Sequence, residues 1–169
     1  MFLIDFGLAQ LFRDPSTRQH VSPISGLKTV GTITFTSINS HSGQTQTRRD
    51  DLESLVYTIV YLCRGSLPWQ DIIKGGHVGR YEATVLKRKT MFAKKLCQGL
   101  PPPFVAFTQH IQSLGFDEKP QYDHLCALLT QCSAHSKAHN FNSVMSDHVT
   151  TSPSLHKLGV PSLPHGQRM

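Results

Sequence analysis

The chain has 169 residues, which is enough for one domain of ordinary size. Hydrophobic residues make up 38% of it, less than is usual in a globular protein, so we expect part of the chain to stay outside a packed core. The formal net charge is +6, but the basic residues are scattered and no basic stripe carries interleaved aromatic side chains, which argues against a nucleic-acid-binding protein.

The cysteines and histidines show no metal-binding pattern. The four cysteines form no C-x-x-C pair, which predicts reduced thiols packed in an intracellular protein. The ten histidines offer no H-E-x-x-H spacing. No apolar run is long enough to cross a membrane, and the short apolar start lacks the basic region of a signal peptide. We therefore expect a cytoplasmic or nuclear protein without a membrane partner.

The first 47 residues combine a possible strand end with a long irregular segment. Phe2-Leu3-Ile4 predicts the end of a buried strand, and Asp5-Phe6-Gly7 follows at once. Asp-Phe-Gly belongs to the protein-kinase signature set, where its Asp binds magnesium. Alone the triplet is a weak signal, and a turn at a strand end explains it better. Residues 13–47 are rich in turn signals, and a stretch this long without periodicity is usually functional.

Residues 50–65 form the clearest helix of the sequence. Asp50 and Asp51 suit its start, where carboxylates accept from free backbone N–H groups, and Gly65 suits its end. The apolar side chains between them leave almost no polar face, which predicts a central helix buried on most sides. Trp69, the only tryptophan, follows directly, and we expect it to pack against the helical core.

Three further helical segments follow. Residues 71–79 are glycine-rich and predict a loose connection. Apolar positions at helical spacing then predict helices over 80–98, broken near Thr90, and over 102–115 and 121–134. Residues 135–169 are dominated by Ser, Thr, Pro, His and Asn and cannot bury enough apolar surface to fold, so we expect a disordered tail.

Several short sequence motifs, taken together and in order, indicate a protein family more specifically than any single motif does. They are Ile4-Asp5-Phe6-Gly7-Leu8-Ala9, Gly31-Thr32, Ser37-Ile38-Asn39 with His41 and Gly43, Arg48-Arg49-Asp50-Asp51-Leu52-Glu53-Ser54-Leu55, Gly65-Ser66-Leu67-Pro68-Trp69-Gln70, and Phe104 with Ser113-Leu114-Gly115-Phe116-Asp117-Glu118-Lys119-Pro120. This set resembles the casein kinase I family of protein Ser/Thr kinases, in which Ser-Ile-Asn replaces the Ala-Pro-Glu of other kinases. The resemblance covers residues 2–133.

The resemblance implies a mainly α fold, part of the larger, helical lobe of a protein kinase. Residues 1–134 would form this partial kinase domain, with an activation segment over residues 5–39 and helices of the large lobe over 50–134. The family implies ATP and Mg²⁺ as cofactors and proteins as substrates.

Four residues match functional positions of the family. Asp5 matches the aspartate that binds Mg²⁺, and Thr32 matches a threonine in the loop that faces the substrate. Asp51 matches the aspartate that holds the backbone of the catalytic loop. Ile33 stands where the family has an arginine, part of an anion site that helps read acidic or phosphorylated substrates. Arg80 matches the basic residue of the neighbouring anion site.

The 169 residues contain no Gly-rich loop, no Val-Ala-Ile-Lys lysine and no His-Arg-Asp catalytic loop, so the catalytic base and the ATP lysine are absent from them. We therefore predict that the chain as written is inactive. The alternative is a non-catalytic pseudokinase remnant or interaction module. Several of Leu55, Ile59, Val60 and Leu62 should then face water and offer an apolar helix face to a protein partner.

Overall fold

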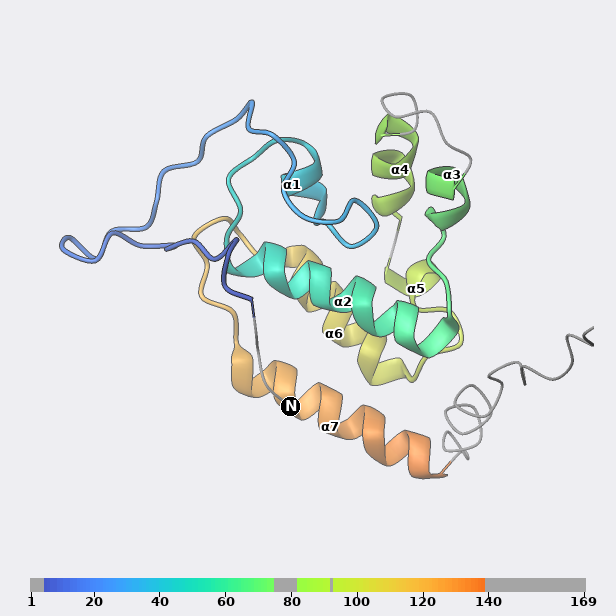
Figure 1. The fold of residues 1–169 in the computed structure, drawn as a ribbon. Helices are drawn as coiled ribbons and strands as arrows, with labels where there is room; N and C mark the ends of the chain where they lie inside the picture. Colours follow the sequence, from blue (N-terminus) through green and yellow to red (C-terminus); the bar gives the residue numbers. More distant parts are fainter. Residues whose placement is uncertain (1–4, 75–81, 92, 139–169) are drawn as a thin grey trace, which may run out of the picture.

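The structure is a computed structural model that describes residues 5–74, 82–91 and 93–138. These residues form helices joined by irregular segments (Figure 1). Their extended backbone pairs only at one isolated bridge, between Arg13 and His20. The predicted mainly α fold is therefore confirmed. The strand end expected at Phe2-Leu3-Ile4 lies outside the described residues.

The helices are arranged around α2 (Figure 1). Their bounds are Ile38–His41 for α1, Arg48–Arg64 for α2, Gln70–Lys74 for α3, Glu82–Lys89 for α4, Ala93–Leu96 for α5, Pro102–Ser113 for α6 and Tyr122–Ala138 for α7. One side of α2 packs on α6, and α7 packs on α6 in turn. α1, α3 and α4 lie on the other side of α2 (Figure 1). In the described part of the chain, no helix is both long and apolar enough to cross a lipid bilayer.

The predicted central helix is confirmed, with a start two residues earlier than expected. Asp50, at the third position of α2, accepts a hydrogen bond from the backbone N–H of Thr47, as in a capping box. Gly65 ends the helix in the left-handed conformation, with φ of 73°.

The expected burial of α2 on most sides is only partly right. Val56, Tyr57 and Val60 are fully buried, whereas Leu55 is 42% exposed and Leu62 is 64% exposed. These two leucines lie seven residues apart and therefore on one edge of the helix. The expectation that several apolar side chains of α2 face water is confirmed for this pair.

Outside α2, the structure confirms one predicted helix boundary and contains two short helices that were not predicted. The predicted break near Thr90 is confirmed, because α4 ends at Lys89 and α5 begins at Ala93. The stretch 71–79, predicted to be loose, begins inside α3, and α1 lies in the segment expected to be irregular. Both helices span five residues or fewer, too short for a periodic signal.

α7 runs to Ala138, past the expected end at residue 134 and into the range predicted to be disordered. Its last residues include Ala134, Lys137 and Ala138, which favour helix even after the apolar pattern has stopped. Residues 139–169, the rest of the predicted tail, lie outside the described residues.

Gly43 is required by a close approach of two loop segments. Its φ is 70°, and a Cβ atom added there would lie 2.6 Å from the carbonyl oxygen of Leu27. The Leu27 N–H also donates to the Gly43 carbonyl at 2.9 Å, so the two backbones cannot move apart freely.

Gly43→Ala should therefore destabilise the fold by about 2–3 kcal/mol, because left-handed strain and a backbone overlap add up. Gly65→Ala is the matched control, since Gly65 has a φ of 73° with nothing within 4 Å of its added Cβ. It should cost about 1 kcal/mol. Urea unfolding followed by circular dichroism measures both. Equal losses would show that the approach of Leu27 does not constrain residue 43.

Candidate functional site

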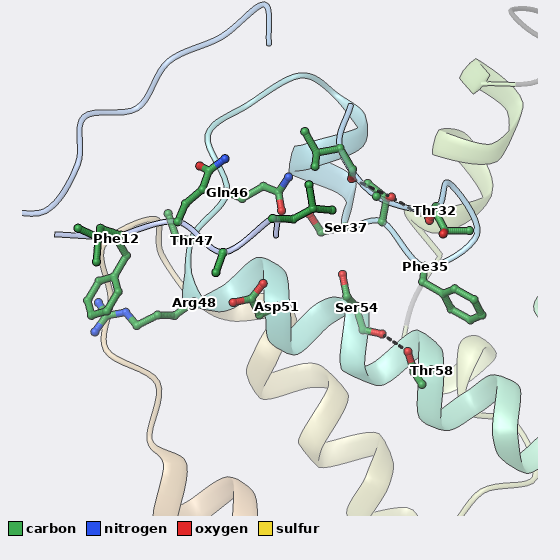
Figure 2. Close-up of a pocket in the computed structure, with 17 residues that line it drawn as sticks. Phe12, Thr32, Phe35, Ser37, Gln46, Thr47, Arg48, Asp51, Ser54 and Thr58 are labelled. Atoms are coloured by element: carbon green, nitrogen blue, oxygen red, sulfur yellow. Dashed lines mark hydrogen bonds between the residues drawn. The ribbon is translucent and has the colours of Figure 1, made fainter. Parts of the chain in front are cut away.

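A cavity of about 440 Å³ lies between the first half of α2 and the segments that precede it. Figure 2 shows Asp51, Ser54 and Thr58 along the side of α2 that faces this cavity, below the segment that carries Ser37. Residues 8–12, 30–32, 35–37 and 46–48 supply the other walls. The cavity therefore gathers parts of the predicted activation segment on the predicted central helix.

Asp51 lies in the wall of this cavity with an exposed side chain. Its carboxylate forms no hydrogen bond or ion pair with any residue that the structure describes. Partial burial, and then the neighbouring charge of Asp50, raise the pKa of Asp51 above its ordinary value. Asp51 thus places an acceptor at the cavity, and its role in holding the backbone of the catalytic loop stays a prediction.

Thr32 lies in another wall of the same cavity, on a tight turn. Its carbonyl oxygen accepts from the Phe35 N–H at 2.9 Å and from the Thr36 N–H at 3.0 Å. The Thr36 hydroxyl donates to it as well, at 2.9 Å. The side chain of Thr32 is exposed, so its hydroxyl is accessible from the cavity. The structure therefore brings two of the predicted site residues, Thr32 and Asp51, to one place.

The triplet Ser37-Ile38-Asn39 is tied to two carboxylates of α2. The Ser37 hydroxyl and the Asn39 amide both donate to Oδ1 of Asp50, at 2.8 Å and 3.0 Å. The Ile38 N–H donates to Oε1 of Glu53 at 3.1 Å. All three members of the triplet thus hold α1 against the first turns of α2.

Asp50 is the centre of this network and is 1% exposed. Its second oxygen, Oδ2, accepts from the backbone N–H of Thr47 at 2.8 Å. The sequence predicts for Asp50 only a role at a helix start, although the spacing from Thr47 to Asp50 is that of a capping box. Glu53 also accepts from the Tyr57 hydroxyl, and burial raises the pKa of Glu53.

Lys89 is a further residue that the sequence does not single out. It is fully buried, and its Nζ donates to main-chain carbonyls of the turn that carries Thr32. In the sequence it is one of several neighbouring basic residues of a helix, which ordinarily form a solvated face.

Asp5 is not among the residues that line the cavity. It is exposed, has a φ of 63°, and its Oδ1 accepts from the Gly7 N–H at 3.3 Å. One carboxylate can be one of the hard oxygen ligands of Mg²⁺. The described residues nevertheless contain no group of three or more His, Cys, Asp or Glu side chains that could hold a metal ion. They do not complete a magnesium site by themselves. Arg80, the predicted anion-binding residue, lies outside the described part of the chain.

Three curated proteins of Schizosaccharomyces pombe are similar to the chain. Casein kinase I homolog 2 is 42% identical over 123 residues, which are 72% of this chain and 28% of the relative. Casein kinase I homolog 1 is 37% identical over 131 residues, 78% of this chain and 29% of the relative. Casein kinase I homolog 3 is 40% identical over 129 residues, 76% of this chain and 29% of the relative.

The matched region thus spans less than a third of the length of each relative. No protein-family model matches the chain.

Proposed function

The chain belongs to the casein kinase I family of protein Ser/Thr kinases, and on this basis we propose that residues 1–134 are part of a kinase catalytic domain. Residues 5–39 act as the activation segment, and the helices from α2 to α7 belong to the larger lobe. The attachment of Ser37-Ile38-Asn39 to Asp50 and Glu53 carries this proposal. It fixes the activation segment on α2, so that Thr32 and Asp51 line one cavity.

Kinases of this kind use ATP and Mg²⁺, and phosphoryl transfer depends on positioning and on charge stabilisation by many groups at once. The 169 residues supply Asp5 as a magnesium ligand but no Gly-rich loop, ATP lysine or catalytic base. We propose that these residues alone neither bind ATP nor transfer phosphate. Asp5 would hold magnesium only together with phosphate oxygens and ligands from elsewhere in a complete kinase domain.

The substrates are proteins, received at the loop of Thr32. Ile33, at a position where the family has an arginine, packs against the hydrophobic core. It places no cation beside Thr32, so we expect a weak preference for acidic or phosphorylated substrates at this point.

A chimera tests the proposal. The region of Casein kinase I homolog 2 that matches this chain is replaced by residues 5–138, and phosphorylation of casein is measured. The chimera should be active, and Asp5→Asn should abolish its activity because the magnesium-binding carboxylate is lost. Asp14→Asn, at an exposed turn of the same segment, is the control and should leave the activity unchanged. A folded chimera that binds ATP but does not phosphorylate casein would refute the proposal.

The exposed leucines of α2 favour a second candidate, a non-catalytic module that binds a protein partner. Leu55 and Leu62 present an apolar edge, and each leucine that stays in water forgoes about 1.5–3 kcal/mol of burial. If this edge is a binding surface, the double variant Leu55→Glu/Leu62→Glu should lower the fluorescence of an apolar dye such as ANS without a change in helix content. Unchanged dye binding would exclude this edge as the apolar surface.

A further inference from the structure

The turn that carries Thr32, residues 30–36, packs on the hydrophobic core through Ile33 and Phe35, and the Phe35 ring meets the Tyr61 ring edge-to-face. Inside the turn, Thr36 and Phe35 bond to the carbonyl of Thr32. These bonds shape the turn but do not place it on the fold. Its position depends on side chains that reach it from other elements.

Two buried side chains supply the polar attachments. Lys89, at the end of α4, donates from Nζ to the Ile33 carbonyl at 2.7 Å and to the Thr36 carbonyl as well. Trp69 donates from Nε1 to the Thr34 carbonyl at 2.8 Å. Two side chains therefore hold three carbonyls of one short turn, and Lys89 makes two of the three bonds.

The surroundings of Lys89 offer its ammonium group carbonyl acceptors and aromatic rings in place of solvent. It is 0% exposed, and its Nζ lies 5.4 Å from the ring centroid of Tyr57 and 5.5 Å from that of Trp69. The two carbonyls and the ring faces together replace the water that a buried ammonium loses. Such a site costs free energy to build, and both hydrogen bonds of the Lys89 ammonium go to carbonyls of the turn.

We propose that Lys89 is a positioning residue, which fixes the Thr32 turn on the fold through its bonds to the carbonyls of Ile33 and Thr36. The consequence for protein substrates rests on the proposed function, because the turn faces substrate only in a kinase. The position of the turn itself does not, and it can be measured in the isolated chain without any activity.

Lys89→Met tests the proposal, because methionine keeps an unbranched apolar chain but has no donor. The chain has one tryptophan, so a single indole N–H signal in the NMR spectrum reports the bond to Thr34. Hydrogen exchange of this indole and of the Phe35 and Thr36 amides should become at least tenfold faster in Lys89→Met. Exchange of amides in α6 should not change. Lys87→Met, at an exposed position of the same helix, is the control and should leave all these rates as they are.

Equal exchange of the indole N–H and of the Phe35 and Thr36 amides in Lys89→Met and Lys87→Met would overturn the inference.

Discussion

Asp50→Ala should destabilise the chain by about 3–5 kcal/mol, because it leaves several buried donors without an acceptor at once. Those donors are the Ser37 hydroxyl, the Asn39 amide and the backbone N–H of Thr47. A whole domain is stable by only about 5–15 kcal/mol, so the loss takes up a large part of the total. The measurement is urea unfolding followed by circular dichroism, with the midpoint as the readout.

The neighbouring Asp51 provides the control for this substitution. It carries the same charge on the same turn of α2, but it is exposed and accepts no hydrogen bond from a described residue. Its pKa is raised, so the charged carboxylate is mildly disfavoured in the fold, and Asp51→Ala should change the stability by less than about 0.5 kcal/mol. Equal losses at the two positions would show that the Asp50 network does not hold α1 on α2.

Trp69→Ala should cost about 3–5 kcal/mol, the range for deleting a large aromatic side chain from a core. Trp69 is 0% exposed and packs edge-to-face on Tyr57 with 4.8 Å between the ring centroids. Its indole also donates to the Thr34 carbonyl, so the substitution removes core volume and one attachment of the Thr32 turn together. Circular dichroism is again the readout, since the substitution removes the only tryptophan fluorophore.

Trp69→Phe separates these two effects, because phenylalanine keeps an aromatic ring but has no donor. It should cost less than Trp69→Ala, and most of its cost should appear as faster exchange at Phe35 and Thr36 rather than as a lower unfolding midpoint. If Trp69→Phe and Trp69→Ala were equally destabilising, the hydrogen bond to Thr34 would matter more than the packing of the ring.

The elements that the sequence predicts well are those whose signals are local. The apolar run of α2, with Gly65 at its end, fixes the helix within a few residues. The burial of Trp69 and the break near Thr90 follow in the same way from single residues and their neighbours. Hydrophobic periodicity and turn residues act over one or two helical turns, so they can be read without knowledge of distant contacts.

The polar core of the fold depends on distant contacts and could not be predicted. Asp50 bonds to residues 11 and 13 positions away, and Lys89 bonds to a turn more than 50 positions away. In the sequence both belong to charged runs, which ordinarily lie in water. Only the tertiary structure shows that each is buried and what it holds.

The residues of the candidate site follow from the family resemblance and not from hydrophobic periodicity or turn residues. The structure places Thr32 and Asp51 on one cavity, and the comparisons confirm the family. Asp5 does not line that cavity, and its role as a magnesium ligand is a proposal that the Asp5→Asn chimera tests.

The most direct test of the account is a titration of the purified 169-residue chain with ATP and Mg²⁺, followed by thermal unfolding. We expect no saturable binding and no shift of the melting temperature, because the groups that would cover the phosphates are absent from these residues. A ligand that binds the folded state at 100 times its Kd would stabilise it by about 2.7 kcal/mol, which such a melt resolves easily. Saturable, magnesium-dependent binding would contradict the account, since these helices would then form a nucleotide site of their own.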